Sequence, residues 1–392
     1  MPKILSVFGT RPEVIKLAPV IHALERLSPR VEISNLASAQ HTTLLHPFVE
    51  LFGIRVQGSL DVMRENQAPE EVCARVLKGI RPVLERESPD MILVQGDTTT
   101  ALAAAMAAFH HRIPVAHVEA GLRSGDRASP FPEEMNRRLI SQLATFHFAA
   151  TRENQRTLVA EGIPGEGIFV TGNPVVDALR WILERHRPSS RLKSLLTATR
   201  GMRRVLLTTH RRESHGPVMA RNLLALKRFV QSHPDVALIF PVHPNPAVKN
   251  VTELVFSDSD RIHLEEPMGY DDFIGLAAQS WLIVSDSGGV QEEAPSLGKP
   301  LLVLRDNTER PEAIQSGVAK LVGGREGRLA QLLEEAYEKG SWVENVAEVQ
   351  NPFGDGRSGE RIAAIVARLF GIPMDGPNAV VKEEEKQCQL PG

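Results

Sequence analysis

Three carboxylates in the first half of the chain stand where the sequence changes from apolar to polar. Asp97 follows the apolar run Met91–Val94, Glu119 ends the run that begins at Val115, and Glu133 follows a proline-rich segment. Carboxylates at such positions can take up and deliver protons. Glu119 is the most informative of them, because a buried carboxylate without a partner is costly and must therefore be paired or functional.

Each of these carboxylates also has a purely structural interpretation. Asp97 can cap the helix that is predicted to start beside it. Glu119 can form an ion pair with Arg123, which follows closely in the sequence. Glu133 can place favourable negative charge at a helix N-terminus. The residue types alone leave both interpretations open.

Basic side chains after other apolar runs indicate phosphate binding. Arg11 follows the first run, in the segment Gly9–Glu13, and Lys16 lies one helical turn beyond it. His210 and Arg211 stand together after the first run of the second half. A guanidinium group can clamp a phosphate, and a histidine can protonate a leaving group. Solvated surface charges are the alternative for each of these residues.

A turn of small residues in the second half is suited to an anion. Ser287, Gly288 and Gly289 follow the run Trp281–Ser285 and precede a predicted helix. Backbone N–H groups and the positive end of the helix dipole would face a ligand there. Glu293, further along this helix, can accept hydrogen bonds from ribose hydroxyls. The pattern differs from the Gly-x-Gly-x-x-Gly motif of dinucleotide-binding proteins, so it does not favour a nicotinamide cofactor.

The order of these runs predicts the fold class. Apolar runs alternate with helical patterns, which is typical of an α/β protein with parallel sheets. A chain of 392 residues is long for one core, so we expect two domains. Chain breakers at Gly172–Pro174 place the domains at 1–172 and 173–356. A helix over about 357–371 is expected to pack back on the first domain, and 373–392 is expected to be a disordered tail.

Composition excludes several classes of protein. The net charge of −3 provides no basic field for nucleic acid. Cys73 and Cys388 are far apart in the sequence, which fits a reducing compartment. The N-terminal apolar run ends at Gly9 and is too short for a signal peptide, and no run approaches the ~20 apolar residues of a membrane span. We expect a cytoplasmic protein without membrane or nucleic-acid partners.

The polar segments resemble those of the non-hydrolysing UDP-N-acetylglucosamine 2-epimerases in order and spacing, over most of the chain. The segments that carry the resemblance are Val7–Glu13, Gly96–Thr100, His117–Arg123, Pro132–Glu134, His210–Glu213, Asp286–Glu293 and Glu309–Glu312. The resemblance implies two Rossmann-like domains of GT-B type with the active site in the interdomain cleft. It also implies a homodimer that uses neither a metal nor a nicotinamide.

The residues and the resemblance together define an expected site. The expected catalytic residues are Asp97, Glu119, Glu133 and His210. The expected substrate-binding residues are Arg11, Lys16, Arg211, His243, Ser287, Gly288, Gly289, Glu293 and Arg310.

The resemblance implies an inversion at carbon 2 that interconverts UDP-N-acetylglucosamine and UDP-N-acetylmannosamine. UDP would leave to give 2-acetamidoglucal and then add back after protonation on the opposite face. Three alternatives stay open: a GT-B glycosyltransferase that uses the same donor, a hydrolysing epimerase that releases N-acetylmannosamine, and a nucleotide-sugar sensor without catalysis.

Overall fold

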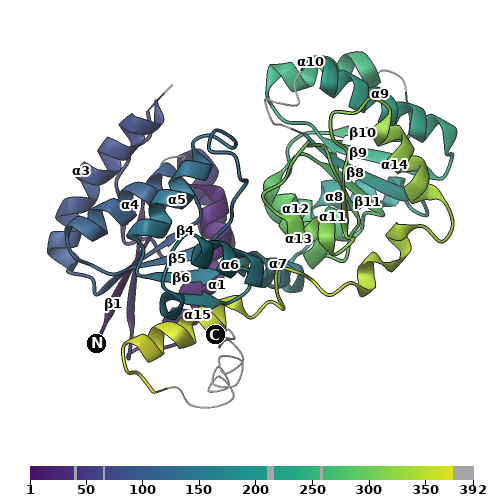
Figure 1. Ribbon diagram of the computed structural model, residues 1–392. Coiled ribbons are helices and arrows are strands. Elements are labelled where there is room, and N and C mark those ends of the chain that lie inside the picture. Colours follow the sequence, from purple (N-terminus) through teal and green to yellow (C-terminus); the bar gives the residue numbers. More distant parts are fainter. Residues whose placement is uncertain (39–41, 65–66, 210–215, 257–258, 374–392) are drawn as a thin grey trace, which may run out of the picture. The chain divides into compact units, whose positions relative to one another are not determined.

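The protein folds as two compact α/β units. The computed structural model describes residues 1–38, 42–64, 67–209, 216–256 and 259–373 (Figure 1). One unit comprises Met1–Ala178 and the described residues from Gly354 onward, and the other comprises Leu179–Phe353. Each unit contains a parallel sheet with alternating helices, so the predicted α/β class with two Rossmann-like domains is confirmed.

Unit 1 is built on a sheet whose strand order in the described residues is β3-β2-β1-β4-β5-β6-β7. The strands are β1 (Lys3–Phe8), β2 (Glu32–Ala37), β3 (Gly58–Ser59), β4 (Met91–Gln95), β5 (Val115–Ala120), β6 (Phe146–Ala149) and β7 (Ile168–Val170). The helices are α1 (Arg11–Glu25), α2 (Thr42–Leu51), α3 (Pro69–Glu87), α4 (Thr99–His110), α5 (Glu133–Leu143), α6 (Arg152–Ala160), the start of α7 (Pro174–Arg185) and α15 (Ser358–Leu369), with a 3-10 turn at Gly165–Gly167.

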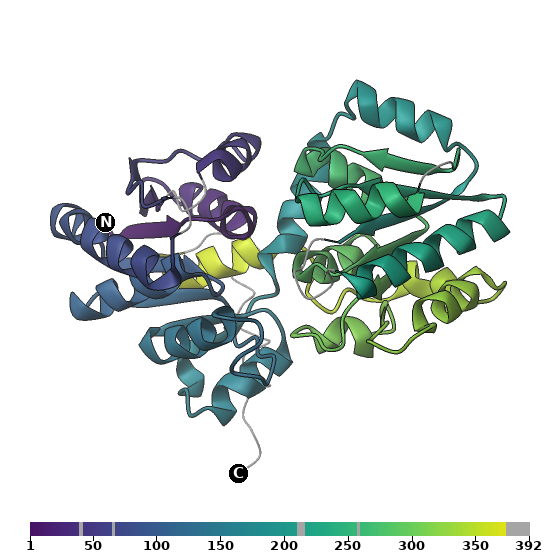
Figure 2. The same ribbon diagram turned by 90° about the horizontal axis from the view of Figure 1, so that it is seen from above.

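Helices cover both faces of this sheet. Helices α3, α4 and α5 lie side by side, and apolar residues of these helices and of β1 and β4 form one core cluster (Figures 1 and 2). The alanine-rich sequence of α4 allows this helix to be buried closely against the strands. Because both faces are covered, the central strands β4 and β5 are buried along their whole length.

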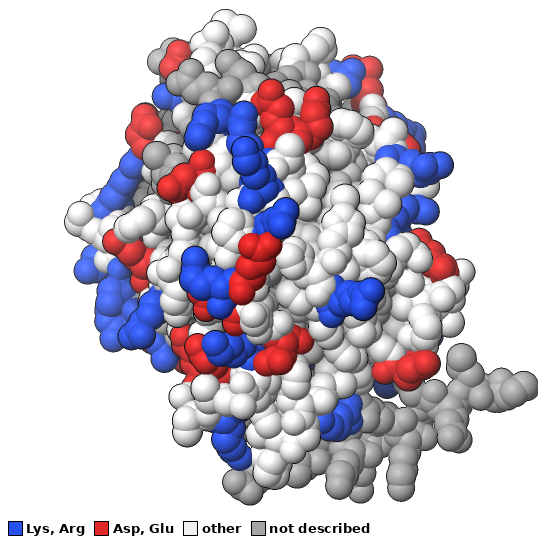
Figure 3. All heavy atoms as spheres, turned by 90° about the vertical axis from the view of Figure 1, so that its left-hand side faces the viewer, with Lys and Arg blue, Asp and Glu red and all other residues white. Residues whose placement is uncertain are grey.

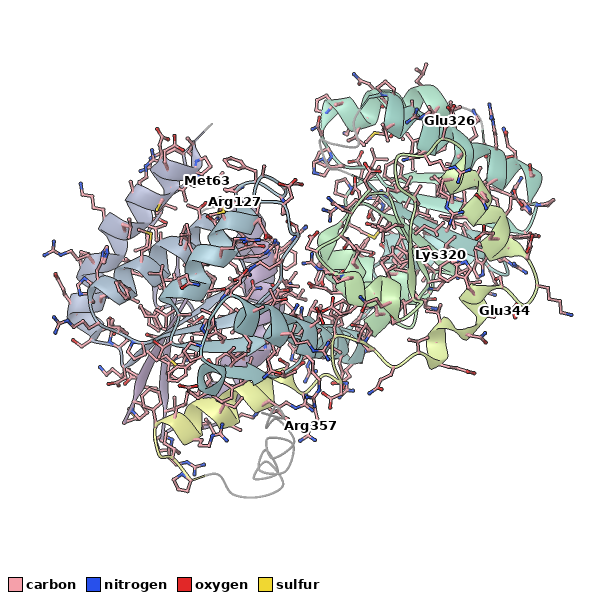
Figure 4. All side chains as sticks on the ribbon, viewed as in Figure 1. Met63, Arg127, Lys320, Glu326, Glu344 and Arg357 are labelled. Atoms are coloured by element: carbon pink, nitrogen blue, oxygen red, sulfur yellow. The ribbon has the colours of Figure 1, made fainter. Side chains whose placement is uncertain are left out.

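The chain returns to unit 1 through α15, which packs on α1. The contact is close at Gly359, where a Cβ atom would lie 2.6 Å from the backbone oxygen of Pro19. Asp177 of α7 accepts hydrogen bonds from the backbone N–H groups of Ser358 (3.1 Å) and Gly359 (2.8 Å). This carboxylate therefore fixes the N-terminus of α15, just after Arg357 (Figure 4).

Unit 2 has the strand order β10-β9-β8-β11-β12-β13 in the described residues. The strands are β8 (Arg203–Thr208), β9 (Val236–Pro241), β10 (Ile262–Glu265), β11 (Leu282–Ser285), β12 (Leu301–Val303) and β13 (Ala319–Leu321). The helices are the end of α7, α8 (Ser190–Ala198), α9 (Pro217–Ser232), α10 (Pro246–Phe256), α11 (Tyr270–Ala278), α12 (Gly288–Ser296), α13 (Pro311–Gln315) and α14 (Arg328–Tyr337), with a 3-10 helix at Trp342–Glu348.

One face of the unit 2 sheet carries a core formed with α9, α10 and α14. At one edge of the sheet, Lys320 of β13 pairs with Glu335 of α14 at 3.2 Å and lies 4.9 Å from the ring centre of Trp342 (Figure 4). An ion pair and a cation–π contact thus hold Lys320 at this edge of the sheet.

The surface mixes charges of both signs. On the face drawn in Figure 3, positive and negative side chains are interspersed among uncharged ones over the described residues. Among the described helices, none combines the length and the apolar character that crossing a bilayer requires.

Candidate active site

The strand orders indicate where each unit can bind a ligand. In unit 1 the order reverses between β1 and β4, and in unit 2 it reverses between β8 and β11. Ligands of open α/β sheets bind at the carboxyl ends of the strands on either side of such a reversal. In unit 1 these ends lead into Gly9 and Gly96, and in unit 2 the β11 end leads into Ser287. These loops carry the polar segments that the sequence singled out.

Glu119 has an unusual backbone conformation at the end of β5. Its φ angle is 65°, in the left-handed region that residues with a side chain seldom adopt. The pairing of β5 with β6 shifts register between Val118 and Ala120, so the strand is interrupted at this residue. Strained conformations of this kind cost about 1–3 kcal/mol and persist where the surroundings impose them, often at functional sites.

Three donors hold the buried side chain of Glu119. Lys16 forms an ion pair with Oε1, the amide of Gln95 donates to Oε2, and the amide of Asn173 donates to Oε1 at 3.0 Å. Donors of this kind stabilise a carboxylate in its ionised form. The expected partner, Arg123, instead pairs with Glu161 at 2.6 Å. That expectation was wrong because Arg123 turns toward α6, whereas the first turns of α1 bring Lys16 to the end of β5.

The segment of Asp97 is held from several sides. The Asp97 carboxylate pairs with Arg137 of α5 at 2.5 Å, and its backbone oxygen accepts from the Asn136 amide at 2.8 Å. The backbone oxygen of Gly96 accepts from Nε2 of His117 at 2.7 Å. The Asp97 side chain itself remains half-buried, so it is both oriented by α5 and accessible for chemistry.

His117 and its neighbour in the sheet, His147, are neutral at pH 7. Burial lowers the pKa of both imidazoles to about 4. A carbonyl oxygen can only accept, so the bond to Gly96 places the hydrogen of His117 on Nε2. We conclude that His117 is a fixed donor to the loop rather than a proton carrier.

Glu13 is a fully buried carboxyl group in the first turn of α1. One oxygen accepts from the backbone N–H groups of Gly9 (2.9 Å) and Thr10 (2.7 Å), and the other accepts from the Thr98 hydroxyl (2.8 Å). Burial raises the pKa of Glu13 to about 7, although these hydrogen bonds act in the opposite direction. Glu13 stands beside Arg11 in the segment Gly9–Glu13, but its role could not be predicted from the sequence.

The raised pKa of Glu13 predicts a change of stability with pH. Because the folded chain binds the proton more tightly than the unfolded chain, the contribution of Glu13 to stability is greatest below about pH 4.5 and is lost as the pH rises through 7. We therefore expect Glu13→Gln to gain stability relative to the wild type between pH 5 and pH 8, by on the order of 3 kcal/mol at most. Denaturant unfolding of both proteins at each pH measures this difference, and an equal difference at both pH values would rule out the assignment.

The other expected residues of unit 1 lie at the same edge of the sheet, and two expected residues of unit 2 lie outside the described residues. Arg11 opens α1, is exposed, and has its guanidinium carbon 5.7 Å from the ring centre of Phe48. Glu133 opens α5 and is half-buried; the connection that leads to it carries Arg127 (Figure 4). His210 and Arg211 lie outside the described residues, directly after the end of β8.

The small-residue turn of unit 2 begins α12 as expected. Ser287 is the N-cap residue, and Gly288 and Gly289 are the first residues of the helix. A Cβ atom on Gly288 would lie 3.0 Å from the Arg310 guanidinium and 3.2 Å from the Glu309 carboxylate. A larger residue would therefore crowd this turn, and glycine keeps the backbone N–H groups of the helix start approachable.

The charged residues around α12 form tight pairs. Arg310 donates from Nε to Glu292 and from a terminal nitrogen to Glu309, both at 2.5 Å, and all three side chains are buried. Glu293 accepts from the Tyr270 hydroxyl at 2.6 Å. His243 is exposed in the loop after β9, where its Nδ1 accepts from a backbone N–H at 3.2 Å. The structure thus gathers Arg310 and Glu293 around the start of α12, whereas His243 lies on the loop after β9, which β8 separates from β11 in the sheet.

Several residues at the site were not assigned a role from the sequence. They are Gln95, Asn136, Arg137, Asn173 and Tyr270. Gln95 had a detectable signal, since a polar residue ends an otherwise apolar run. Asn173 had the weaker signal of a residue before proline at a chain break. Arg137 and Tyr270 had none, because their partners are set by tertiary packing.

One group of side chains in the described part of the chain has ligand types that suit a cation. The ligand atoms of His186, Asp271 and Asp272 lie within 4.8 Å of one another. Nε2 of His186 is 2.8 Å from Asp272, and the same carboxylate oxygen accepts from the backbone N–H of Ser189 at 3.2 Å. These hydrogen bonds connect the segment after α7 to α11 and have a structural role.

Comparison with known proteins finds similar sequences that match most of the chain. A family model described as UDP-N-acetylglucosamine 2-epimerase matches residues 22–367. The UDP-N-acetylglucosamine 2-epimerase of Yersinia pestis is 44% identical over 365 residues, which cover 92% of this chain and 97% of the relative.

Solved structures of such enzymes have the same fold. The UDP-GlcNAc 2-epimerase of Neisseria meningitidis bound to UDP-GlcNAc has a TM-score of 0.87 at 40% identity, covering 94% of this chain and 100% of that one. The enzyme of Methanocaldococcus jannaschii in complex with UDP-GlcNAc and UDP has a TM-score of 0.80 at 36% identity, covering 93% and 99%. Matches of this length and identity show that the chain belongs to the UDP-N-acetylglucosamine 2-epimerase family.

Proposed function

We propose that this protein interconverts UDP-N-acetylglucosamine and UDP-N-acetylmannosamine without hydrolysing either. Membership of the family supports the choice of nucleotide sugar. The observation that carries the proposal is the placement of Glu119 at the end of β5 and of Asp97 just after the adjacent strand β4. Lys16 and two amides hold Glu119, and Arg137 holds Asp97. Inversion requires one group to remove a proton and another to return one, and two carboxylates in different environments suit these tasks.

The proposed reaction is an elimination followed by an addition. As the bond from carbon 1 to the diphosphate breaks, its electron pair leaves with UDP, and the positive charge that develops at carbon 1 acidifies the hydrogen on carbon 2. A carboxylate takes this proton, and the electrons of the C–H bond form the double bond of 2-acetamidoglucal. Protonation of carbon 2 on the opposite face and return of the UDP oxygen to carbon 1 then give the epimer.

Unit 2 is proposed to stabilise the UDP that leaves. The start of α12 offers backbone N–H groups and a positive dipole end to a diphosphate. Glu293 is proposed to accept from the ribose hydroxyls, and its bond to Tyr270 would orient it for this task. His210 and Arg211 remain part of the proposal as groups that neutralise the developing charge.

The test is to incubate the pure protein with UDP-N-acetylglucosamine in heavy water and to follow the products by NMR. The proton taken from carbon 2 exchanges with solvent before one is returned. We therefore expect every molecule of UDP-N-acetylmannosamine to carry deuterium at carbon 2, and recovered substrate at equilibrium to carry it too. Conversion in the presence of Glu119→Gln protein serves as the control for contaminating activity.

The alternatives give different spectra. Hydrogen retained at carbon 2 of the product would exclude elimination and re-addition. Free N-acetylmannosamine with UDP as the end products would indicate a hydrolysing epimerase. A glycosyltransferase would leave the nucleotide sugar unchanged in this assay and would consume it only after an acceptor is added.

The family resemblance also supports a homodimer and a cytoplasmic location as parts of the proposal. Light scattering of the purified protein tests the first, since a mass equal to one chain of 43.1 kDa would exclude a dimer. Cell fractionation tests the second.

A further inference from the structure

We propose that Glu13 is a positioning residue that fixes the loop of Arg11 to the loop of Asp97. This inference rests on the proposed function, because it assigns Glu13 a role in the same reaction. The two loops follow β1 and β4, the strands between which the order of the unit 1 sheet reverses. A single side chain that binds both loops sets the separation of the groups they carry.

The hydrogen bonds of Glu13 join the two loops directly. Oε2 accepts from the backbone of Gly9 and Thr10, the two residues before Arg11. Oε1 accepts from the hydroxyl of Thr98, the residue after Asp97. Each bond lies between 2.7 and 2.9 Å, and the side chain is fully buried. Glu13 reaches both loops from the first turn of α1, the helix that follows the first of them.

Helix capping alone does not explain this arrangement. A glutamate at the third position of a helix often accepts from the N-cap backbone N–H, here that of Thr10. That interaction uses one oxygen of Glu13. The other oxygen is bonded to Thr98, 85 residues away in the sequence, which capping does not require. A capping residue without a second task could also stay in water, whereas burying this carboxyl group is unfavourable.

The bond to Thr98 completes the support of the Asp97 loop. His117 holds the backbone oxygen of Gly96, and Asn136 holds that of Asp97. Both contacts come from β5 and α5, on one side of the loop. Glu13 is the contact from α1, on the side of the loop that faces β1. Removal of the Glu13 side chain would therefore leave Asp97 oriented by α5, but the Asp97 loop would no longer be bonded to the loop of Arg11.

The test compares four variants of the two residues. Glu13→Ala removes all three bonds, and misplacement of the loops should lower kcat about a hundredfold. Thr98→Val removes the link between the loops together with the N-cap bond that the Thr98 hydroxyl accepts from the backbone N–H of Ala101, so it should lower kcat about tenfold and also cost some stability. Thr98→Ser, which keeps the hydroxyl, should retain most of the activity. Glu13→Gln can still accept from the backbone and donate to Thr98, so it should rescue most of the loss in Glu13→Ala.

A double-mutant cycle separates a shared role from two independent ones. If the residues act through one link, Thr98→Val should have little further effect on kcat in the Glu13→Ala background. UDP affinity, measured by calorimetry, should change much less than kcat. Additive losses would overturn the proposal. Full activity in Thr98→Val would also overturn it, and this activity can be measured even if Glu13→Ala fails to fold.

Asp177→Ala is the matched control. Asp177 is also a carboxylate in unit 1 that accepts from two backbone N–H groups at a helix N-terminus, but it holds α15. This variant should lower the thermal midpoint without a comparable loss of kcat. An equal loss of kcat in both variants at equal midpoint would show that Glu13 is structural only. Absence of epimerisation by the wild type would contradict the proposed function itself. A fully active Thr98→Val enzyme would contradict only the role of Glu13, so the two failures can be distinguished.

Discussion

Replacing Glu119 with glutamine is expected to lower kcat about 10³-fold, because the variant keeps the shape of the side chain and loses the group that exchanges a proton. The three donors around Glu119 come from separate elements, with Lys16 on α1, Gln95 at the end of β4 and Asn173 before α7. These donors hold the side chain in one position. The glutamine of Glu119→Gln cannot ionise, and it cannot move to compensate for the lost carboxylate. UDP affinity should change little, since the groups proposed to bind UDP lie in unit 2.

The expected loss must be separated from a loss of stability. Glu119→Gln deprives the buried ammonium group of Lys16 of its carboxylate partner, which destabilises the fold. A double variant with Lys16→Met removes that charge and should recover stability without recovering turnover. Glu161→Gln is a control of the same chemical kind, since it breaks the ion pair with Arg123 in the same unit. Turnover of Glu119→Gln within tenfold of the wild type would exclude Glu119 as an essential acid or base.

The central strands of both sheets could be predicted because they are apolar on both faces. The run Met91–Val94 falls within β4 of unit 1, and the run Trp281–Ser285 contains β11 of unit 2. The strands that were not predicted lie at sheet edges in the described residues: β3, β10 and β13. An edge strand has fewer neighbours and is partly exposed, as in the alternating sequence Ile262–Glu265, so it needs no continuous apolar run.

The positions of the site residues could be predicted better than their partners. Strand ends are readable from the sequence, so Asp97 and Glu119 were located correctly at the carboxyl edge of the sheet. The partner of Glu119 was not, because Lys16 lies 103 residues away and reaches it only after α1 docks beside the strands. Arg123 was the nearest candidate in sequence, but contacts in a parallel sheet join segments that are far apart in the chain.

Arg310 shows how burial changes the meaning of a motif. Its sequence position suggests a cation beside the diphosphate. In the structure its guanidinium group joins Glu292 and Glu309, and Glu309 also binds Arg305 at 2.8 Å. The first effect of losing Arg310 should therefore be on the stability of unit 2. The two carboxylates form a frame that holds the guanidinium group next to the start of α12, where Gly288 leaves room for it.

Arg310→Met is expected to destabilise unit 2 by about 3–5 kcal/mol, because it takes this cation away from the buried carboxylate of Glu292 and leaves Glu309 with Arg305 but without Arg310. Denaturant unfolding followed by a probe in unit 2, such as the fluorescence of Trp281 or Trp342, measures this loss. Arg310→Lys keeps the charge but cannot donate in two directions from a rigid plane, so an intermediate loss is expected. UDP should also stabilise Arg310→Met less than it stabilises the wild type, if the guanidinium group supports the diphosphate site.

Two further variants decide whether the buried charge causes the loss of stability in Arg310→Met. Arg191→Met breaks an ion pair in the same unit between an exposed arginine and the half-buried Glu265, and it should cost no more than about 1 kcal/mol. Combining Arg310→Met with Glu292→Gln removes the negative charge of the carboxylate that paired with Arg310, and this should recover part of the lost stability. No recovery would mean that the loss comes from packing of the arginine stem rather than from its charge. In that case the two glutamates would not hold Arg310 in place by charge, and its position beside α12 would need another explanation.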